Sequence, residues 1–220
     1  PYPPCQVLSP VTVLVKICGI KNTQQLNAVI NAGADFIGFV YYPKSPSHLE
    51  LSAIKTLIET MPNHVYPVVV TVDPDDGLVE KINMLSPAYI QLHGNESPAR
   101  VNEIKSQLTH TMIIKAIPVK TADDINHATE YTSCADLLLF DTKADNMHGG
   151  SGKSFDWSLL AGKKIALPWM LSGGLTPVNV ADAIAQTDAG MVDVSSGVES
   201  APGVKDTVLI KQFIEAAKRI

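Results

Sequence analysis

The chain has 220 residues, of which 45% are hydrophobic and 18% are charged, as expected for a globular protein with a large buried core. No apolar run approaches the ~20 residues that a membrane-spanning helix needs, so a membrane partner is not expected. The formal charge of -5 argues against a nucleic-acid surface, which would need clustered lysine and arginine facing the phosphates.

The first ten residues differ in composition from the rest of the chain. Residues 1–10 are rich in proline and lack the charged and apolar regions of a signal peptide, so we interpret them as a leader that is disordered, processed or part of a fusion. No linker or low-complexity stretch divides residues 11–220. We therefore predict one catalytic domain over that range.

Short apolar runs alternate with longer stretches of helical period along the whole domain. The expected strands are 12–18, 35–41, 66–72, 88–93, 112–118, 135–141, 166–172 and 190–195. The expected helices are 23–32, 51–60, 74–85, 97–107, 121–131, 157–161, 177–186 and 205–219. Helix starts are indicated by possible N-caps at Thr23, Ser97, Thr121 and Thr176, and by first-turn prolines at Pro98 and Pro177.

Eight strands at a spacing of ~25 residues, each followed by a helix, favour an α/β fold of the closed (β/α)8 TIM-barrel type over an open sheet. Such barrels place their chemistry at the C-terminal ends of the strands. Candidate functional residues are therefore sought there.

The first strand ends at Cys18. A thiol at a strand end and close to a helix N-terminus can have a lowered pKa and act as a base or nucleophile. The alternative is a small buried side chain that only fills space.

The fourth and sixth strands end in His93 and Asp141. His93 is a candidate for substrate contact, or alternatively a hydrogen-bond partner of a neighbouring loop. Asp141 emerges from an apolar run, where partial desolvation favours a protonated carboxyl group that can act as a general acid. Its alternative role is a cap, or an ion pair with Lys143.

Glycine-rich turns follow the seventh and eighth strands, at Gly173-Gly174 and Ser196-Gly197. Glycine lets the backbone approach a ligand closely, and free N–H groups with serine hydroxyls can hold a phosphate where many barrels bind one. The alternative is that they are ordinary turns. Their position after these two strands favours phosphate binding.

The three cysteines, Cys5, Cys18 and Cys134, lie far apart and form no C-x-x-C pair. This pattern indicates a reducing, cytoplasmic setting. The histidines have no metal-ligand spacing, so neither a metal nor a cofactor is expected.

Seven segments, in order, resemble the phosphoribosylanthranilate isomerase family of tryptophan biosynthesis. They are KICGI (16–20), DFIGFVYYPKSP (35–46), QLHGNE (91–96), LFDTK (139–143), GGSGKSFDW (149–157), LSGGLTPVNV (171–180) and DVSSGVESAPGVKD (193–206). The resemblance implies an aldose-ketose isomerase that converts a small phosphoribosyl substrate, N-(5'-phosphoribosyl)anthranilate, into 1-(2-carboxyphenylamino)-1-deoxyribulose 5-phosphate by an Amadori rearrangement.

The resemblance also assigns roles to individual residues. It makes Cys18 the general base at C2' and Asp141 the general acid at the ring oxygen, in agreement with their strand-end positions. Asp193 becomes a sugar contact. The phosphate-holding residues are Gly150, Gly173, Gly174, Ser196 and Gly197.

One position departs from the family pattern. After the second strand the family usually has Ser-Pro-Arg, with the arginine facing the anthranilate carboxylate, whereas Ser47 stands here. Serine cannot supply the two-pronged charged contact of arginine. We hypothesise that Lys44 or His48 neutralises the carboxylate instead.

Two other functions stay open at this stage. One is the related isomerase of histidine biosynthesis, or a dual-substrate isomerase, although that family has aspartate where Cys18 stands and binds a second phosphate. The other is a non-catalytic barrel that binds a phosphorylated metabolite. The sequence leaves both a monomer and a homodimer open.

Overall fold

The fold was examined in a computed structural model, which describes residues 12–142 and 154–219. The predicted leader 1–10 and the site candidate Gly150 lie outside the described residues. Among the described residues no helix is long and apolar enough to cross a membrane.

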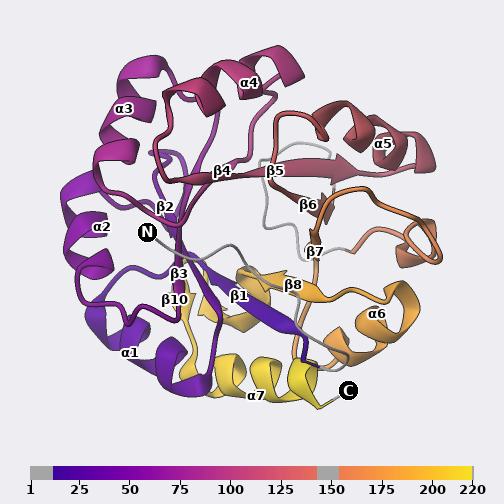
Figure 1. The fold of residues 1–220 in the computed structure, drawn as a ribbon. Coiled ribbons are helices and arrows are strands. Elements are labelled where there is room, and N and C mark those ends of the chain that lie inside the picture. The colour runs from indigo at the N-terminus through magenta and orange to yellow at the C-terminus, as the bar shows by residue number, and fades with distance from the viewer. Residues whose placement is uncertain (1–11, 143–153, 220) are drawn as a thin grey trace.

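Eight parallel strands form a closed barrel in the order of the sequence, and the helices surround it (Figure 1). The barrel strands are β1 (Leu14–Cys18), β2 (Phe36–Val40), β3 (Tyr66–Thr71), β4 (Tyr89–Leu92), β5 (Met112–Val119), β6 (Leu137–Thr142), β7 (Trp169–Leu171) and β8 (Met191–Val194). Closure comes from the pairing of β1 with β8, in which Lys16 lies opposite Asp193. The predicted TIM barrel is confirmed.

Seven α-helices lie in the described ranges. They are α1 (Thr23–Ala32), α2 (Leu51–Ile58), α3 (Asp76–Met84), α4 (Pro98–Gln107), α5 (Ala122–His127), α6 (Val180–Thr187) and α7 (Thr207–Lys218). Three 3-10 helices are η1 (Ala128–Tyr131), η2 (Trp157–Leu159) and η3 (Ser196–Val198). The expected sixth helix, 157–161, is therefore only the short η2.

Two of the predicted helix caps are wrong. The side chain of Asn22, not Thr23, caps α1 by accepting a hydrogen bond from Gln25 N at 2.9 Å. α6 begins after Asn179, because Thr176 and Pro177 form a turn ahead of the helix. Ser97 does cap α4, with its Oγ accepting from Arg100 N, and Pro98 opens that helix as expected.

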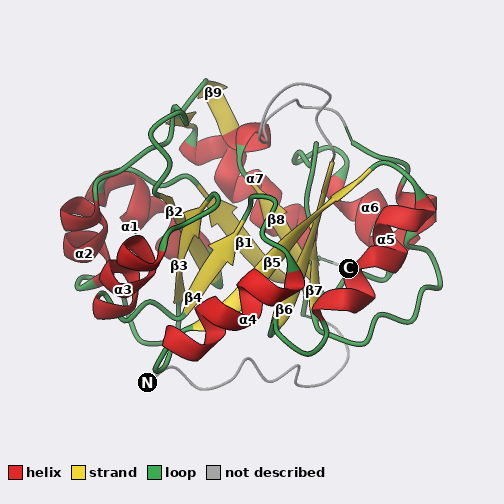
Figure 2. Ribbon diagram, turned by 90° about the horizontal axis from the view of Figure 1, so that it is seen from above, coloured by secondary structure: helices red, strands yellow, loops and turns green. Residues whose placement is uncertain are grey.

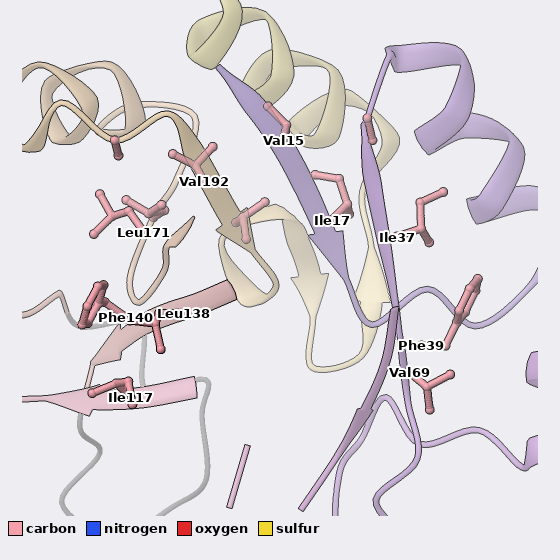
Figure 3. Packing of buried hydrophobic residues seen from close by; sticks show 14 of the residues in the cluster. Val15, Ile17, Ile37, Phe39, Val69, Ile117, Leu138, Phe140, Leu171 and Val192 are labelled. Atoms are coloured by element: carbon pink, nitrogen blue, oxygen red, sulfur yellow. The ribbon is translucent and has the colours of Figure 1, made fainter. Parts of the chain in front are cut away.

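The alternation of side chains along each strand separates two packed regions. One lies between the strands and the helices and contains, among others, Val15, Ile17, Ile37, Phe39 and Phe140 (Figure 3). The other fills the barrel interior, where Phe36 stacks on Tyr66 with ring centroids 5.0 Å apart. Cys18 belongs to the interior set, so its thiol lies inside the barrel.

A two-stranded antiparallel sheet that the sequence did not predict joins β9 (Glu199–Ala201) to β10 (Val204–Lys205). Figure 2 shows β9 beyond one end of the barrel. Lys205 holds this hairpin to the end of β8, because its buried ammonium donates to Ser195 O at 3.0 Å, Ser195 Oγ at 3.2 Å and Glu199 Oε1 at 2.6 Å. These three bonds use all the hydrogens of the ammonium.

Candidate active site

A cavity of about 830 Å³ is lined by residues at the C-terminal ends of several barrel strands and by the loops that follow them. Its lining includes Cys18 from β1, His93 after β4 and Asp141 from β6. The closed sheet thus brings together the thiol and the carboxyl group that the sequence proposed as a catalytic pair. The structure itself does not assign their roles.

Cys18 lies at the buried end of this cavity, with 7% of its surface exposed. Burial raises the pKa of the thiol above its ordinary value, while the positive charges of Lys16 and Lys205 act in the opposite direction. The pKa is therefore raised rather than lowered as expected, because desolvation inside the barrel outweighs the two lysines.

Lys16 is the fully buried neighbour of Cys18 on the interior face of β1, and the sequence analysis overlooked it. Its ammonium lies 2.7 Å from Asp193 Oδ1. Burial acts against the charged form, but Asp193 and Cys18 outweigh it, so the pKa of Lys16 is raised and the lysine stays protonated. A lysine two residues before Cys18 inside an apolar strand was the available signal, since side chains at i and i+2 share a face.

Asp193 was expected to contact the sugar, and it does line the cavity. Both of its oxygens already have protein partners: Lys16 Nζ on Oδ1, and Ser172 Oγ on Oδ2 at 3.0 Å. Its side chain is also almost completely buried. Asp193 therefore holds the ammonium of Lys16 in a buried ion pair.

Asp141 lies in a more open part of the cavity, and each of its carboxyl oxygens has a polar neighbour. His93 Nε2 is 3.2 Å from Asp141 Oδ2, and Thr142 N donates to Oδ1 at 2.8 Å. The other ring nitrogen of His93, Nδ1, lies 2.7 Å from Nε2 of Gln91, a second residue that the sequence analysis missed. Lys143, the suggested partner of Asp141, lies outside the described residues.

The glycine-rich turns after β7 and β8 also line the cavity through Gly173, Gly174, Ser196 and Gly197. Gly173 and Gly174 have φ angles of 89° and 67°, in the left-handed region that glycine adopts without strain. At Gly197 a Cβ atom would collide with the carbonyl oxygen of Leu175. These positions therefore need glycine for backbone geometry, which also suits the close approach of a ligand.

The two suggested partners for a substrate carboxylate differ in position. Lys44 is exposed and lines the cavity. Ser47 also lines the cavity but is buried. His48 is absent from that lining: its Nδ1 accepts a hydrogen bond from Tyr42 N at 3.1 Å, and its Nε2 is 3.1 Å from Glu50 Oε1. The geometry favours Lys44 over His48.

Closed eight-stranded parallel barrels that carry their active-site cavity at the C-terminal ends of the strands form a class of enzymes, the TIM-barrel enzymes, and this chain has that arrangement. In the part of the chain that the structure describes, no group of three or more histidine, cysteine or acidic side chains is placed to hold a metal ion.

Comparison with known proteins identifies the family. The family model for N-(5'-phosphoribosyl)anthranilate isomerase matches residues 15–216. The N-(5'-phosphoribosyl)anthranilate isomerase of Parvibaculum lavamentivorans is 46% identical over 214 residues, covering 94% of this chain and 99% of that protein. That of Rhodopseudomonas palustris strain HaA2 is 44% identical over 211 residues, covering 94% and 96%. The chain belongs to the N-(5'-phosphoribosyl)anthranilate isomerase family.

Solved structures give the same result. The crystal structure of phosphoribosyl anthranilate isomerase from Thermotoga maritima has a TM-score of 0.85 and 37% sequence identity, covering 94% of this chain and all (100%) of that one. A phosphoribosyl anthranilate isomerase in complex with reduced 1-(o-carboxyphenylamino)-1-deoxyribulose 5-phosphate has a TM-score of 0.79 and 33% identity, with 94% and 100% coverage.

Proposed function

We propose that this chain converts N-(5'-phosphoribosyl)anthranilate into 1-(2-carboxyphenylamino)-1-deoxyribulose 5-phosphate, as a cytoplasmic enzyme of tryptophan biosynthesis. The observation that carries the proposal is the shared cavity, in which Cys18 and Asp141 meet the glycine-rich turns after β7 and β8. Family membership supplies the substrate and the reaction. The wide spacing of the cysteines supports a reducing compartment.

Asp141 is the general acid in this mechanism. It protonates the furanose ring oxygen, the bond from that oxygen to C1' breaks, and the anthranilate nitrogen forms an iminium with C1'. The cavity leaves Asp141 partly accessible, with 16% of its side chain exposed. A hydrogen bond from the Thr142 backbone and the close contact with His93 Nε2 orient the group toward the ligand.

Cys18 is the general base. As a thiolate it removes the proton from C2', the electrons form a C1'–C2' double bond, and the iminium nitrogen becomes neutral. The resulting enolamine then tautomerises to the ketone. The positive charge of the neighbouring Lys16 favours the thiolate form. Burial of the site keeps water away from the labile intermediate.

The phosphate is held by Gly173, Gly174, Ser196 and Gly197, with Gly150 as a further candidate. Backbone N–H groups in glycine-rich turns after the seventh and eighth strands are suited to an anion. Because the protein carries Ser47 in place of the family arginine, Lys44 neutralises the anthranilate carboxylate. Replacing Lys44 by alanine should raise KM about tenfold, whereas His48→Ala should leave KM unchanged, because each charged hydrogen bond contributes roughly 1.5–3 kcal/mol.

The decisive test is the isomerase assay with purified wild type, Cys18→Ala and Asp141→Asn. Each variant is expected to lose about 10²–10⁴-fold in kcat/KM, the usual contribution of one general acid or base. Parallel turnover of the phosphoribosyl substrate of the histidine-pathway isomerase tests the dual-substrate alternative. Growth of a tryptophan-requiring strain that lacks the isomerase tests the binding-protein alternative. A wild-type protein without turnover or rescue, or a fully active Cys18→Ala, contradicts the proposal.

A further inference from the structure

Gln91 is a buried amide whose two ends have different surroundings. It lies on β4, lines the cavity and is only 1% exposed. Its Nε2 lies 2.7 Å from His93 Nδ1, whereas its Oε1 is buried with no hydrogen-bond partner among the described residues. An unpaired buried acceptor costs free energy, so stability alone gives no reason for an amide here.

The contact between Gln91 and His93 determines where the imidazole carries its proton. An amide nitrogen has only hydrogens to offer, so His93 Nδ1 must accept. A neutral imidazole that accepts at Nδ1 is protonated at Nε2. Nε2 is the atom that lies 3.2 Å from Asp141 Oδ2, so this ring nitrogen meets the carboxyl oxygen as an N–H group and cannot accept a proton from it.

This arrangement controls the direction of the acidic proton of Asp141. The Nε2–H group of His93 lies beside Oδ2, and Oδ1 receives a hydrogen bond from the Thr142 backbone N–H. Neither donor can take up a proton from the carboxyl group, so the proton is left for the ligand in the cavity. With the opposite tautomer, His93 Nε2 would be an acceptor and would compete with the substrate for that proton.

The backbone of the loop that carries His93 is held in place by a second buried network. The backbone N–H of His93 donates to Thr71 O at 2.9 Å. Glu96 accepts from Gly94 N at 3.1 Å, and the buried Lys115 binds both Gly94 O and Glu96 at 2.9 and 2.8 Å. With the backbone held in place, Gln91 acts on the tautomer of the His93 imidazole through its contact with Nδ1.

We propose that Gln91 is a positioning residue that fixes His93 in its Nε2–H tautomer and thereby directs the proton of Asp141 toward the ribose ring oxygen. This inference rests on the proposed function only for the identity of the ligand. The tautomer itself is a property of the free protein and is measurable without substrate.

The first experiment is nitrogen-15 NMR of the histidine rings at a pH where they are neutral, with the His93→Asn variant used to assign the His93 signals. In wild type we expect an unprotonated shift at Nδ1 and a protonated shift at Nε2. In Gln91→Glu, the carboxylate can only accept, so the proton should move to Nδ1 or the ring should become doubly protonated. Protonated Nδ1 in the wild type would overturn the proposal.

The second experiment measures steady-state kinetics. Both Gln91→Leu and Gln91→Glu should lower kcat by about tenfold or more while KM changes by less than about threefold, since the loss concerns proton transfer rather than binding. The matched control is Gln212→Leu, the same change at an exposed position on α7, which should keep wild-type values. Equal thermal unfolding of the variants establishes that they fold.

A double-variant cycle separates this role from direct contact with the substrate. In the His93→Asn background, Gln91→Leu should cause no further loss of kcat, because the residue acts through the imidazole. An equal loss in both backgrounds would contradict the proposal. Wild-type turnover with no effect of Gln91 refutes only this inference, whereas absence of wild-type turnover refutes the proposed function.

Discussion

The two sides of the cavity stabilise their reactive groups in different ways. On the side of β1 and β8, Cys18 lies beside the buried ion pair of Lys16 and Asp193, whose side chains are 0% and 6% exposed. On the side of β4 and β6, Asp141 is 16% exposed and is oriented by His93 and a backbone N–H. A base that must be an anion in a buried place needs a buried positive charge, whereas an acid that must meet a ligand needs orientation and access.

The largest expected effect is the loss of kcat/KM when Cys18 or Asp141 is replaced. Cys18→Ser should lose about 10²–10⁴-fold in kcat/KM, because a hydroxyl at the same buried place does not ionise. Asp141→Glu keeps a carboxyl group at the more open side and should lose less than Cys18→Ser. Steady-state assays of the two variants measure the difference, and a serine variant with near-wild-type activity would exclude the thiolate.

The buried ion pair of Lys16 and Asp193 should make a large contribution to the free energy of unfolding. Lys16→Met leaves Asp193 as an unpaired buried charge and should reduce the free energy of unfolding by about 3–5 kcal/mol. The double variant Lys16→Met/Asp193→Asn should recover part of that loss. Urea unfolding measures both.

The control for this prediction is Lys105→Met, which breaks the pair of Lys105 and Asp136 at the surface, where the side chains are 40% and 31% exposed. It should cost at most about 1 kcal/mol. Equal losses for the buried and the exposed pair would show that burial does not distinguish them.

The close packing around the thiol is tested at Gly38 on β2. A Cβ atom there would lie 2.8 Å from Cys18 Sγ and 3.1 Å from Cys18 Cα. Gly38→Ala should therefore destabilise the protein by about 1–3 kcal/mol and lower kcat, as overpacking displaces the thiol. Gly190→Ala, where the added atom would meet nothing within 4 Å, should change stability by less than about 0.5 kcal/mol.

The pH dependence of activity tests the environment of the thiol. Because burial raises the pKa of Cys18, the thiolate fraction should increase as the pH rises, by up to about tenfold per unit below that pKa. In Asp141→Asn, where the acid no longer titrates, the residual kcat/KM should follow this fraction. Lys16 opposes the shift, so adding Lys16→Met to that variant should move the rising limb to higher pH. A residual activity of Asp141→Asn that falls over the ordinary thiol range would contradict the role of Cys18 as the base.

The same shift affects folding with a definite sign. The folded chain disfavours the thiolate, so the contribution of Cys18 is present below the pKa of the unfolded thiol and is lost as the pH rises through the higher folded value. Stability should therefore decline on the alkaline side. Cys18→Ala should remove that part of the decline, which unfolding curves at several pH values can measure.

The sequence predicted the fold and the strand-end positions of Cys18 and Asp141, the two proposed catalytic residues, because both depend on local pattern. Alternating strand and helix periods fixed the barrel, and the end of an apolar strand identified Cys18 and Asp141. Lys16 and Gln91 were missed because a polar residue within an apolar strand gives no partner from sequence alone. The hairpin β9–β10 was missed because strands of three and two residues carry no measurable alternation.

The chain by itself determined where each reactive group stands along a strand, since side-chain direction follows from the two-residue repeat of β structure. Only the tertiary structure decided which groups meet: Lys16 and Asp193 are 177 residues apart, and His93 reaches Asp141 from a different strand end. The physical reason is that the register of barrel closure, not neighbourhood in the chain, places side chains within hydrogen-bonding distance. That register also decided that Asp193 binds a lysine.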